Sequence, residues 1–430
     1  MSIQRRQFLK RLAQIGGIAS FTPFFQTAQG QSLLASFRAN ENRSIDAIVR
    51  DESFWYQIKN AYTVSPAMIN LNNGGVSPSP KVVQEAVERY NQLCNETPSY
   101  YMWRVLDQGR EPIREKLADL GGCSPEEIAI HRNASEALET IIFGLRLKKG
   151  DEIVLTKQDY PHMIDAWKQR AHRDGVVLKF LNFEFPITDK KQLIDRFVNA
   201  FSERTKVVHI THVINWVGQI LPVKEIATEA KKRGIEVVVD AAHSFAQFEY
   251  AIPELNCDYL GTSLHKWLCA PFGSGMLYVK KEKIKNLYPL FAANDPESED
   301  IQKFEHLGTR SFAIEQAIGQ AIDFHLMIGS KQKEARLRYL NDYWVSKVKD
   351  LPSVQIHSPQ EPEYSCGIGS FSIKNKSASE VSSLLFRDYK IHTTGINWEN
   401  IHAVRVSPNV YTVTKDLDKL VKAIKALSKS

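Results

Sequence analysis

The feature that most constrains the fold is a regular alternation of short apolar runs with amphipathic stretches between residues 127 and 279. Runs that are apolar at every position, such as 237–239, are typical of strands buried on both faces of a sheet. Helices between successive strands are the connections that a parallel sheet needs. The pattern therefore predicts an α/β fold with a doubly wound, mostly parallel sheet. Strands are expected at 128–131, 152–156, 176–181, 207–211, 236–240 and 259–263, and helices at 135–145, 162–172 and 223–232.

The sequence on either side of this region has a different pattern. Residues 68–80 predict a short strand and a turn-rich loop, and Pro80 can open the helix that follows. From about residue 331 the pattern changes to long helices and a strand pair near 370–373 and 404–406. We expect this last part to form a smaller α+β domain.

Charge and cysteine content exclude some classes of partner. The 55 basic and 49 acidic side chains give a formal net charge of +6, and they form no long basic tract. A small molecule is therefore a better candidate partner than a nucleic acid. The five cysteines are odd in number and include no Cys-x-x-Cys pair. The sequence indicates neither a disulfide scaffold nor a metal site.

The first thirty residues form a distinct segment. The run RRQFLK at residues 5–10 precedes an apolar stretch over 12–25, an order that resembles a bacterial twin-arginine export signal. The stretch contains Gly16, Gly17 and Pro23 and is shorter than a membrane-spanning helix. We expect residues 1–30 to be a signal peptide that directs export to the periplasm by the twin-arginine machinery. A basic terminal helix is the alternative.

The most informative motif surrounds Lys266. This lysine follows the predicted strand at 259–263, with His265 beside it and Ser263 three positions before it. It is placed to form an imine while its neighbours bind an anion. Together with the run VVVDAAH at 237–243, the motif resembles the class V (fold type I) family of pyridoxal-phosphate enzymes. That family includes cysteine desulfurases, kynureninases and isopenicillin N epimerases.

The resemblance extends from about residue 69 to residue 427, and segments 72–76 and 308–310 are similar to the isopenicillin N epimerase-like subgroup. It implies pyridoxal 5′-phosphate as the cofactor and Lys266 as the Schiff-base lysine, with Ser263 and His265 at the phosphate. Asp240 matches the carboxylate that keeps the ring nitrogen protonated and so makes the ring an electron sink. Its place at the carboxyl end of a strand is where open α/β sheets bind ligands. Taken singly, Lys266 would be a surface charge and Asp240 a cap or turn residue.

Other segments match further positions around the cofactor. Asn133, Ala134 and Ser135 resemble the strand-to-helix turn whose backbone N–H groups receive the phosphate, although Ser135 is also explained as an N-cap. Tyr160 matches the ring that stacks on the cofactor. His243 matches a position beside the phenolic oxygen, and a core histidine is the alternative.

The remaining matches concern the substrate and a second subunit. Trp167 matches a tryptophan common downstream of the stacking ring. Asn215 matches an asparagine beside the cofactor oxygen and the substrate carboxylate, and a buried loop-closing asparagine is the alternative. Arg405 matches the arginine that pairs with the substrate carboxylate, for which a planar fork is well suited. Thr309 matches a threonine that reaches the phosphate of the other subunit's cofactor, which implies a homodimer with shared active sites.

These matches imply a division of the chain and a range of reactions. Beyond the signal, we expect residues 31–110 to contribute to the small domain and to dimer contacts, 111–325 to form the large cofactor-binding domain, and 326–430 to form the small α+β domain. Lys266 can serve as the general base at the α carbon of an amino acid or small peptide. An aminotransferase or epimerase is the first hypothesis and a lyase the second.

Two other hypotheses stay open at this stage. A cysteine desulfurase needs a nucleophilic cysteine shortly before the carboxylate-binding arginine, and segment 391–402 contains none. An exported binding protein that retains the fold without catalysis would have no need of an imine-forming lysine. The sequence does not identify the substrate, the amino acceptor or the site of signal cleavage.

Overall fold

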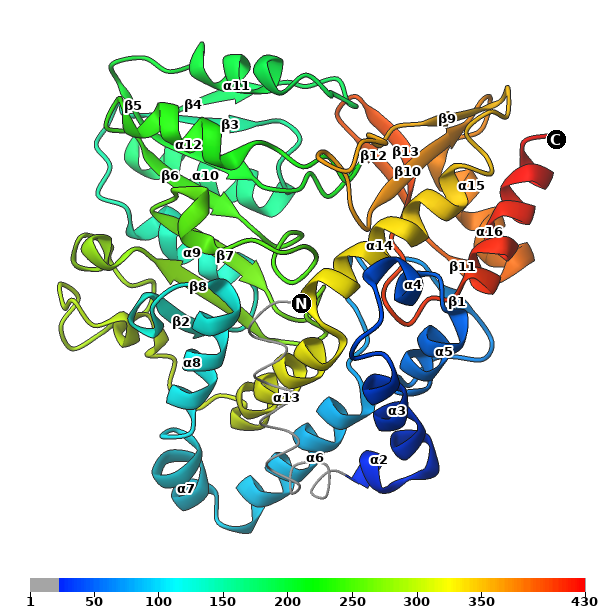
Figure 1. Ribbon diagram of the computed structural model, residues 1–430. Helices are drawn as coiled ribbons and strands as arrows, with labels where there is room; N and C mark the ends of the chain where they lie inside the picture. The colour runs from blue at the N-terminus through cyan, green and yellow to red at the C-terminus, as the bar shows by residue number, and fades with distance from the viewer. Residues whose placement is uncertain (1–22, 430) are drawn as a thin grey trace.

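The computed structural model describes residues 23–429, which surround a central seven-stranded sheet (Figure 1). The strand order is β2-β8-β7-β6-β5-β3-β4, and only β8 runs antiparallel to its neighbours. The predicted α/β fold with a mostly parallel sheet is therefore confirmed. The strands are β2 (Ile128–His131), β3 (Glu152–Thr156), β4 (Val177–Leu181), β5 (Thr205–Thr211), β6 (Glu236–Asp240), β7 (Tyr259–Ser263) and β8 (Gly275–Val279).

Both faces of this sheet are covered by helices, as the apolar runs predict. In β6, Val237 and Val239 pack into one hydrophobic cluster with residues of α8 and α12, whereas Val238 packs into a second cluster with residues of α9 and α10. All three valines are fully buried. The helices concerned are α8 (Arg110–Gly121), α9 (Ala134–Gly144), α10 (Pro161–Asp174), α11 (Lys190–Val198), α12 (Val223–Lys231) and α13 (Phe312–Ile328).

The C-terminal part contains a separate four-stranded antiparallel sheet in the order β12-β13-β10-β9. The predicted strand pair is confirmed, because Ser370 in β10 lies opposite Arg405 in β13. Segment 391–402, where no strand was predicted, contains β11, β12 and the start of β13. The elements are α14 (Ser330–Val345), β9 (Val354–Ile356), β10 (Gly369–Ile373), α15 (Ala378–Tyr389), β11 (Ile391–His392), β12 (Thr394–Trp398), β13 (Ile401–Val406) and α16 (Thr414–Leu427).

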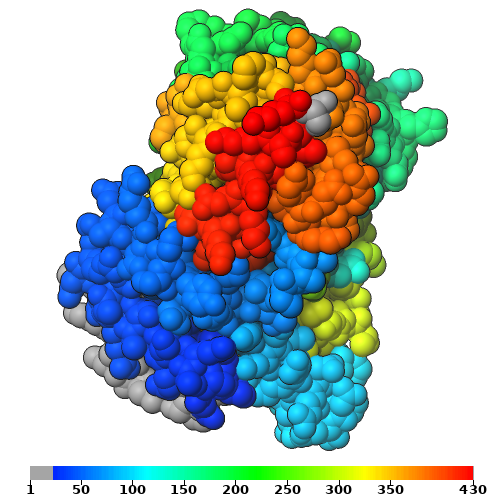
Figure 2. All heavy atoms as spheres, turned by 90° about the vertical axis from the view of Figure 1, so that its right-hand side faces the viewer, coloured from blue at the N-terminus to red at the C-terminus, as the bar shows by residue number. Residues whose placement is uncertain are grey.

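The N-terminal segment packs against this C-terminal part. Strand β1 (Ile69–Asn70) pairs in parallel with β11, and Lys59 forms an ion pair with Asp416 of α16 (2.7 Å). Figure 2 shows the red C-terminal segment next to blue atoms of the N-terminal segment on one face. The segment contains α2 (Pro23–Gln26), α3 (Ala28–Ala39), α4 (Ile45–Val49), α5 (Glu52–Asn60), α6 (Lys81–Glu96), α7 (Pro98–Tyr100) and the π-helix η1 (Tyr101–Leu106).

The predicted export signal falls mainly outside the described residues, which include neither the arginine pair at 5–6 nor the stretch up to residue 22. Residues 23–30 are described, and they belong to α2 and the start of α3. Phe24 and Phe25 are buried in the main core, and the Phe24 N–H donates to the Glu85 carboxylate in α6 (3.1 Å). Within residues 23–429, no helix combines the length and apolarity that crossing a bilayer requires.

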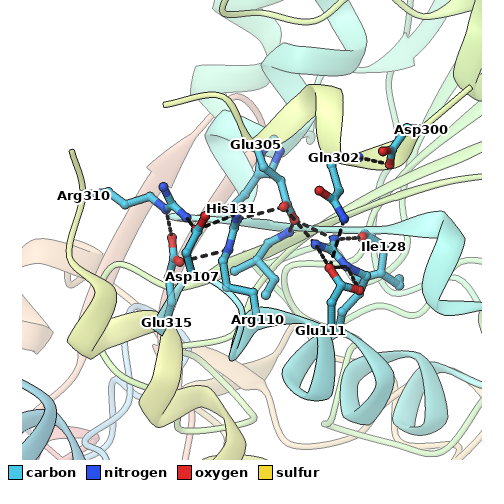
Figure 3. A network of polar contacts seen from close by, with 12 residues as sticks. Asp107, Arg110, Glu111, Ile128, His131, Asp300, Gln302, Glu305, Arg310 and Glu315 are labelled. Carbon is cyan, nitrogen blue, oxygen red and sulfur yellow. Dashed lines mark hydrogen bonds and ion pairs between the residues drawn. The ribbon is translucent and has the colours of Figure 1, made fainter. Parts of the chain in front are cut away.

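A buried polar network joins β2 to the helices beneath the sheet (Figure 3). The Glu305 carboxylate, at the end of the 3₁₀ helix η5 (Ile301–Glu305), accepts hydrogen bonds from the Ile130 N–H (2.6 Å) and from Arg114 (2.7 and 2.9 Å). Arg110 bridges Glu305 (2.9 Å) and Glu315 of α13 (3.1 Å). Two buried arginines thus pair with the buried Glu305 and the partly buried Glu315, and these ion pairs fix β2 against α8, η5 and α13. Further 3₁₀ helices are η2 (Pro125–Glu127), η3 (Ile252–Leu255) and η4 (Lys281–Asn286).

Candidate active site

A cleft of about 390 Å³ opens at the carboxyl ends of β5, β6 and β7, where the C-terminal part meets the sheet. Every predicted site residue except Thr309 lines it. These residues come from six separate segments of the chain, so the fold brings together residues that are far apart in the sequence. They are Asn133, Ala134, Ser135, Tyr160, Asn215, Asp240, His243, Ser263, His265, Lys266 and Arg405.

Lys266 lies in the irregular turn after β7. Its Nζ is 3.2 Å from Nε2 of His243 and 6.0 Å from the centre of the Tyr160 ring. Removal from bulk water lowers the pKa of Lys266 to about 8; the Arg405 cation acts in the same direction, and the Asp240 carboxylate opposes it. At a pH near this pKa a considerable fraction of the Lys266 amine is therefore neutral and nucleophilic.

Asp240 ends β6 and is buried. Its Oδ1 accepts a hydrogen bond from the Ala242 N–H (2.9 Å), and no ion pair with a cation forms within residues 23–429. Burial raises the pKa of this carboxyl group, although the Ala242 N–H and Lys266 favour the charged form. A buried carboxylate of this kind is suited to a cationic ring N–H from a bound group.

A strand-to-helix turn forms one wall of the cleft. The Asn133 side chain caps α9 by accepting from the Glu136 N–H (2.8 Å), so Asn133 is the N-cap and Ser135 is not. The Ala134 N–H donates to Ser263 Oγ (2.9 Å), which joins this turn to the end of β7. A Cβ at Gly275 would lie 2.5 Å from the Asn133 backbone nitrogen, so only glycine lets β8 pass so close. The first turn of α9 thus faces the cleft with the N-terminal end that binds anions.

The two cleft histidines are electrically neutral for a common reason. Burial lowers the pKa of His265 to about 4 and that of His243 well below its usual range, and the neighbouring Lys266 adds to both shifts. The carbonyl of Ser274 lies 3.0 Å from Nδ1 of His265, so Nδ1 carries the proton. His265 would donate to a phosphate from Nε2 only after a second protonation, which a bound anion favours.

Two predicted aromatic residues have different environments. Tyr160 precedes α10, is 44% exposed, and forms a wall of the cleft near Lys266. Trp167 is fully buried in the core and donates from Nε1 to Nδ1 of His209 (3.3 Å). Trp167 is therefore a core residue and does not line the cleft.

Arg405 and Asn215 meet at the other side of the cleft. The Arg405 guanidinium donates to the Asn215 carbonyl (3.1 Å) and to Asn72 Oδ1 (2.8 Å), while its Nε has no partner among the described residues. The side-chain oxygen of Asn215 is buried and also lacks a partner there, which is unlike a loop-closing asparagine. A Cβ at Gly74 would lie 3.5 Å from the Arg405 Cζ. One donor of Arg405 and one acceptor of Asn215 therefore remain unsatisfied at this side of the cleft among the described residues.

Thr309 lies away from the cleft, on an exposed segment between η5 and α13. The next residue, Arg310, holds this segment in place through Glu315 (2.7 Å) and Asp107 (2.7 Å) (Figure 3). The predicted role of Thr309 requires a second subunit and stays a prediction.

Several lining residues were not predicted from the sequence. Thr394 and Ile396 belong to β12, a strand that was not predicted, and Trp216 stacks on Trp398 with ring centres 5.8 Å apart. No cysteine lines the cleft as the described residues form it. Gly74 and Gly75 also line the cleft, and the pattern Asn-Asn-Gly-Gly is the feature of the sequence that could have predicted this.

Comparison with known proteins identifies the family. Residues 69–420 match the model of the family described as aminotransferase class-V. The chain belongs to this family. It is accordingly a pyridoxal-phosphate-dependent enzyme, and the buried Asp240, the Lys266 amine and the α9 turn provide groups that fit the ring, the aldehyde and the phosphate of that cofactor.

Its relatives have more than one activity. The isopenicillin N epimerase of Streptomyces clavuligerus is 28% identical over 391 residues, which are 87% of this chain and 98% of the relative. A probable cysteine desulfurase of Synechocystis sp. is 29% identical over 366 residues, covering 80% of this chain and 84% of the relative. The apo structure of a cysteine desulfurase from Thermococcus onnurineus NA1 superposes with a TM-score of 0.75 at 24% identity, over 86% of this chain and 97% of that one. The last similarity supports the fold type I architecture alone.

Proposed function

We propose that this enzyme acts at the α carbon of an amino acid or small peptide, as an aminotransferase or an epimerase. The supporting observation is that Lys266, Asp240 and Arg405 converge on one cleft that no described cysteine lines. These three groups serve a reaction in which a proton moves at the α carbon of a bound carboxylate.

Each group has a defined task in this proposal. When bound, pyridoxal phosphate supplies a ring that withdraws electrons from the α carbon. Asp240 would hold the ring nitrogen protonated, and His243 would lie beside the phenolic oxygen. The Lys266 amine would hold the cofactor and would serve as the base that takes or returns the α proton.

The remaining residues bind and orient. Asn133, Ala134 and Ser135 offer the phosphate the N-terminal end of α9, and Ser263 and His265 complete its contacts. Tyr160 would pack on the face of the ring. Arg405 and Asn215 orient the substrate carboxylate.

A lyase is the second candidate, since elimination begins with the same proton removal. A desulfurase is disfavoured, because persulfide chemistry needs an accessible thiol at the substrate. Cys366, the cysteine nearest in sequence to β12, is buried, and its Sγ lies 3.9 Å from the Gln247 carbonyl. A binding protein without catalysis is disfavoured because the reacting lysine and its carboxylate partner are both present.

The reaction can be tested by incubating the holoenzyme with amino acids and dipeptides in D₂O. Deuterium at the α carbon, detected by NMR, together with inversion of configuration, detected by chiral chromatography, would support an epimerase. Conversion of the substrate into a 2-oxo acid when an amino acceptor is added would support an aminotransferase. Lys266→Ala should abolish both. Sulfide release from cysteine without α-proton exchange would refute the proposal.

Assembly and location are further parts of the proposal. We place the enzyme in a homodimer in which Thr309 reaches the partner's cofactor phosphate, and Thr309→Ala should then weaken cofactor retention by about 1.5–3 kcal/mol.

We place the mature enzyme in the periplasm. Replacing Arg5 and Arg6 with lysine should leave active enzyme in the cytoplasm, and unchanged fractionation would refute export by the twin-arginine route.

A further inference from the structure

The turn that carries Lys266 has no regular secondary structure, so its backbone must be fixed by individual hydrogen bonds. Three consecutive carbonyls in this turn are each bound by a backbone N–H. The donors to the carbonyls of Leu264, His265 and Lys266 are the N–H groups of Ala270 (3.1 Å), Ser77 (3.1 Å) and Cys269 (3.3 Å), respectively.

The fourth carbonyl of the turn, that of Trp267, has a charged donor. It accepts a hydrogen bond from Nζ of Lys333, which lies in the first turn of α14. A side chain from the C-terminal part of the molecule therefore provides the last of the four hydrogen bonds that fix the backbone of this turn. No sequence motif indicates this contact, because the two residues are 66 positions apart.

Lys333 is buried, with 2% of its surface exposed. Its other polar contact is to Nδ1 of His325 (3.4 Å), and within residues 23–429 no carboxylate forms an ion pair with it. Burial lowers the pKa of Lys333 to about 8. Removing an ammonium group from water without a carboxylate partner costs several kcal/mol. Because a leucine at this position would avoid this cost, the lysine is best explained by the hydrogen bond that its amine donates to the Trp267 carbonyl.

The Trp267 carbonyl is rigidly coupled to the cleft. The Trp267 ring is fully buried and contacts His243 edge to face, with ring centres 6.4 Å apart. A Cβ at Gly367 would lie 3.1 Å from this ring, so the ring has little room to shift. His243 in turn contacts the Lys266 amine. Displacement of the Trp267 carbonyl would thus move both Lys266 and the imidazole beside it.

We infer that Lys333 is a positioning residue for Lys266: by binding the Trp267 carbonyl, its amine holds the turn so that the Lys266 amine points at the cofactor site. This inference rests on the proposed role of Lys266. Lys333 touches neither cofactor nor substrate and acts through the backbone. Since α14 carries Lys333, the C-terminal part contributes to the geometry of the reacting amine as well as to carboxylate binding through Arg405.

The test replaces Lys333 with methionine, which has a similar length and no donor. A misplacement of about 1 Å costs on the order of 100-fold in rate. We expect the cofactor-free Lys333→Met chain to take up pyridoxal phosphate about 10–100-fold more slowly than wild type, as followed by absorbance. The holoenzyme should lose kcat by a similar factor, with KM changed less than about twofold. Lys331→Met, on an exposed side chain of the same helix turn, is the matched control and should leave both rates unchanged.

A purely structural role for Lys333 would lower the melting temperature without slowing cofactor uptake by the folded protein. That result, or uptake within about twofold of wild type, would overturn the inference. If Lys333→Met is not recovered folded, Lys333→Gln takes its place, because the glutamine amide ends one bond short of the lysine amine and should also slow uptake. Lys266→Ala serves as a reference: if it is as active as wild type, the proposed function fails, whereas the Lys333 variants are judged by uptake alone.

Discussion

Replacing Arg405 with lysine keeps the positive charge at the substrate side of the cleft but removes the planar fork. In the structure the guanidinium uses two of its five N–H donors on the Asn215 carbonyl and Asn72 Oδ1, and its Nε is free within the described chain. Burial lowers the pKa of Arg405 to about 10, so the group stays charged at neutral pH. The free donors can then bind a carboxylate through two parallel hydrogen bonds.

The size of the effect follows from the number of bonds lost. A lysine ammonium can replace one of the two charge-assisted bonds to the carboxylate but not both. One such bond is worth about 1.5–3 kcal/mol, which corresponds to an increase in KM of roughly 10–150-fold. Because the bond is present before and during the reaction, kcat should change little.

The assay compares an amino acid substrate with its carboxamide. Wild-type enzyme should strongly prefer the acid, and Arg405→Lys should lose most of that preference by a rise in KM for the acid alone. Arg387→Lys, at an exposed arginine paired with Asp388, is the control and should behave as wild type. An Arg405→Lys enzyme whose acid-to-amide preference equals that of wild type would refute the assignment of Arg405 as the carboxylate site.

Three further predictions follow from the buried charges. Asp240→Asn should keep the fold and melting temperature but lose most turnover, because an amide cannot stabilise a protonated ring nitrogen; turnover near that of wild type would contradict its role. Glu305→Gln should lower the free energy of unfolding by about 3–5 kcal/mol in a denaturant titration, since it leaves two buried arginines short of a partner, whereas Glu111→Gln, at a half-exposed side chain, should cost less than about 1 kcal/mol. Asp159 accepts bonds from Thr156 and Thr211, yet burial and the nearby Asp240 raise its pKa from 3.8 to about 7. The folded cofactor-free chain then keeps a proton that the unfolded chain has lost, so stability falls as pH rises from about 4 to about 7; Asp159→Asn should flatten this slope, and an unchanged slope would show that Asp159 is ionised throughout.

The central sheet and the main site could be predicted from the sequence because both depend on local patterns. Strands buried on both faces are apolar at every position, as Val237, Val238 and Val239 illustrate. Parallel strands also end at one edge of the sheet. Residues at or just after these ends, such as Asp240 and Lys266, can therefore be predicted to lie close together without a model of side-chain packing.

The parts that were missed depend on contacts between distant segments. The arginine and glutamate network is one example, since Arg114 and Glu305 are 191 positions apart and each resembles a surface residue in the sequence. Strand β12 is another, because its five residues are mostly part-buried or exposed and it becomes a strand by pairing with β13. Trp167, which was matched only to a tryptophan common in the family, fills the core, and its burial depends on packing that the motif does not indicate.

The central claim, that Lys266 holds the cofactor, is tested most directly by reduction of the holoenzyme with sodium borohydride followed by proteolysis and peptide mass spectrometry. Reduction fixes the cofactor on the lysine that binds it. The account predicts a single phosphopyridoxyl label on the peptide that contains Lys266, and no label on that peptide in Lys266→Ala. A label on Lys333 or on any other lysine of the wild-type chain would contradict it.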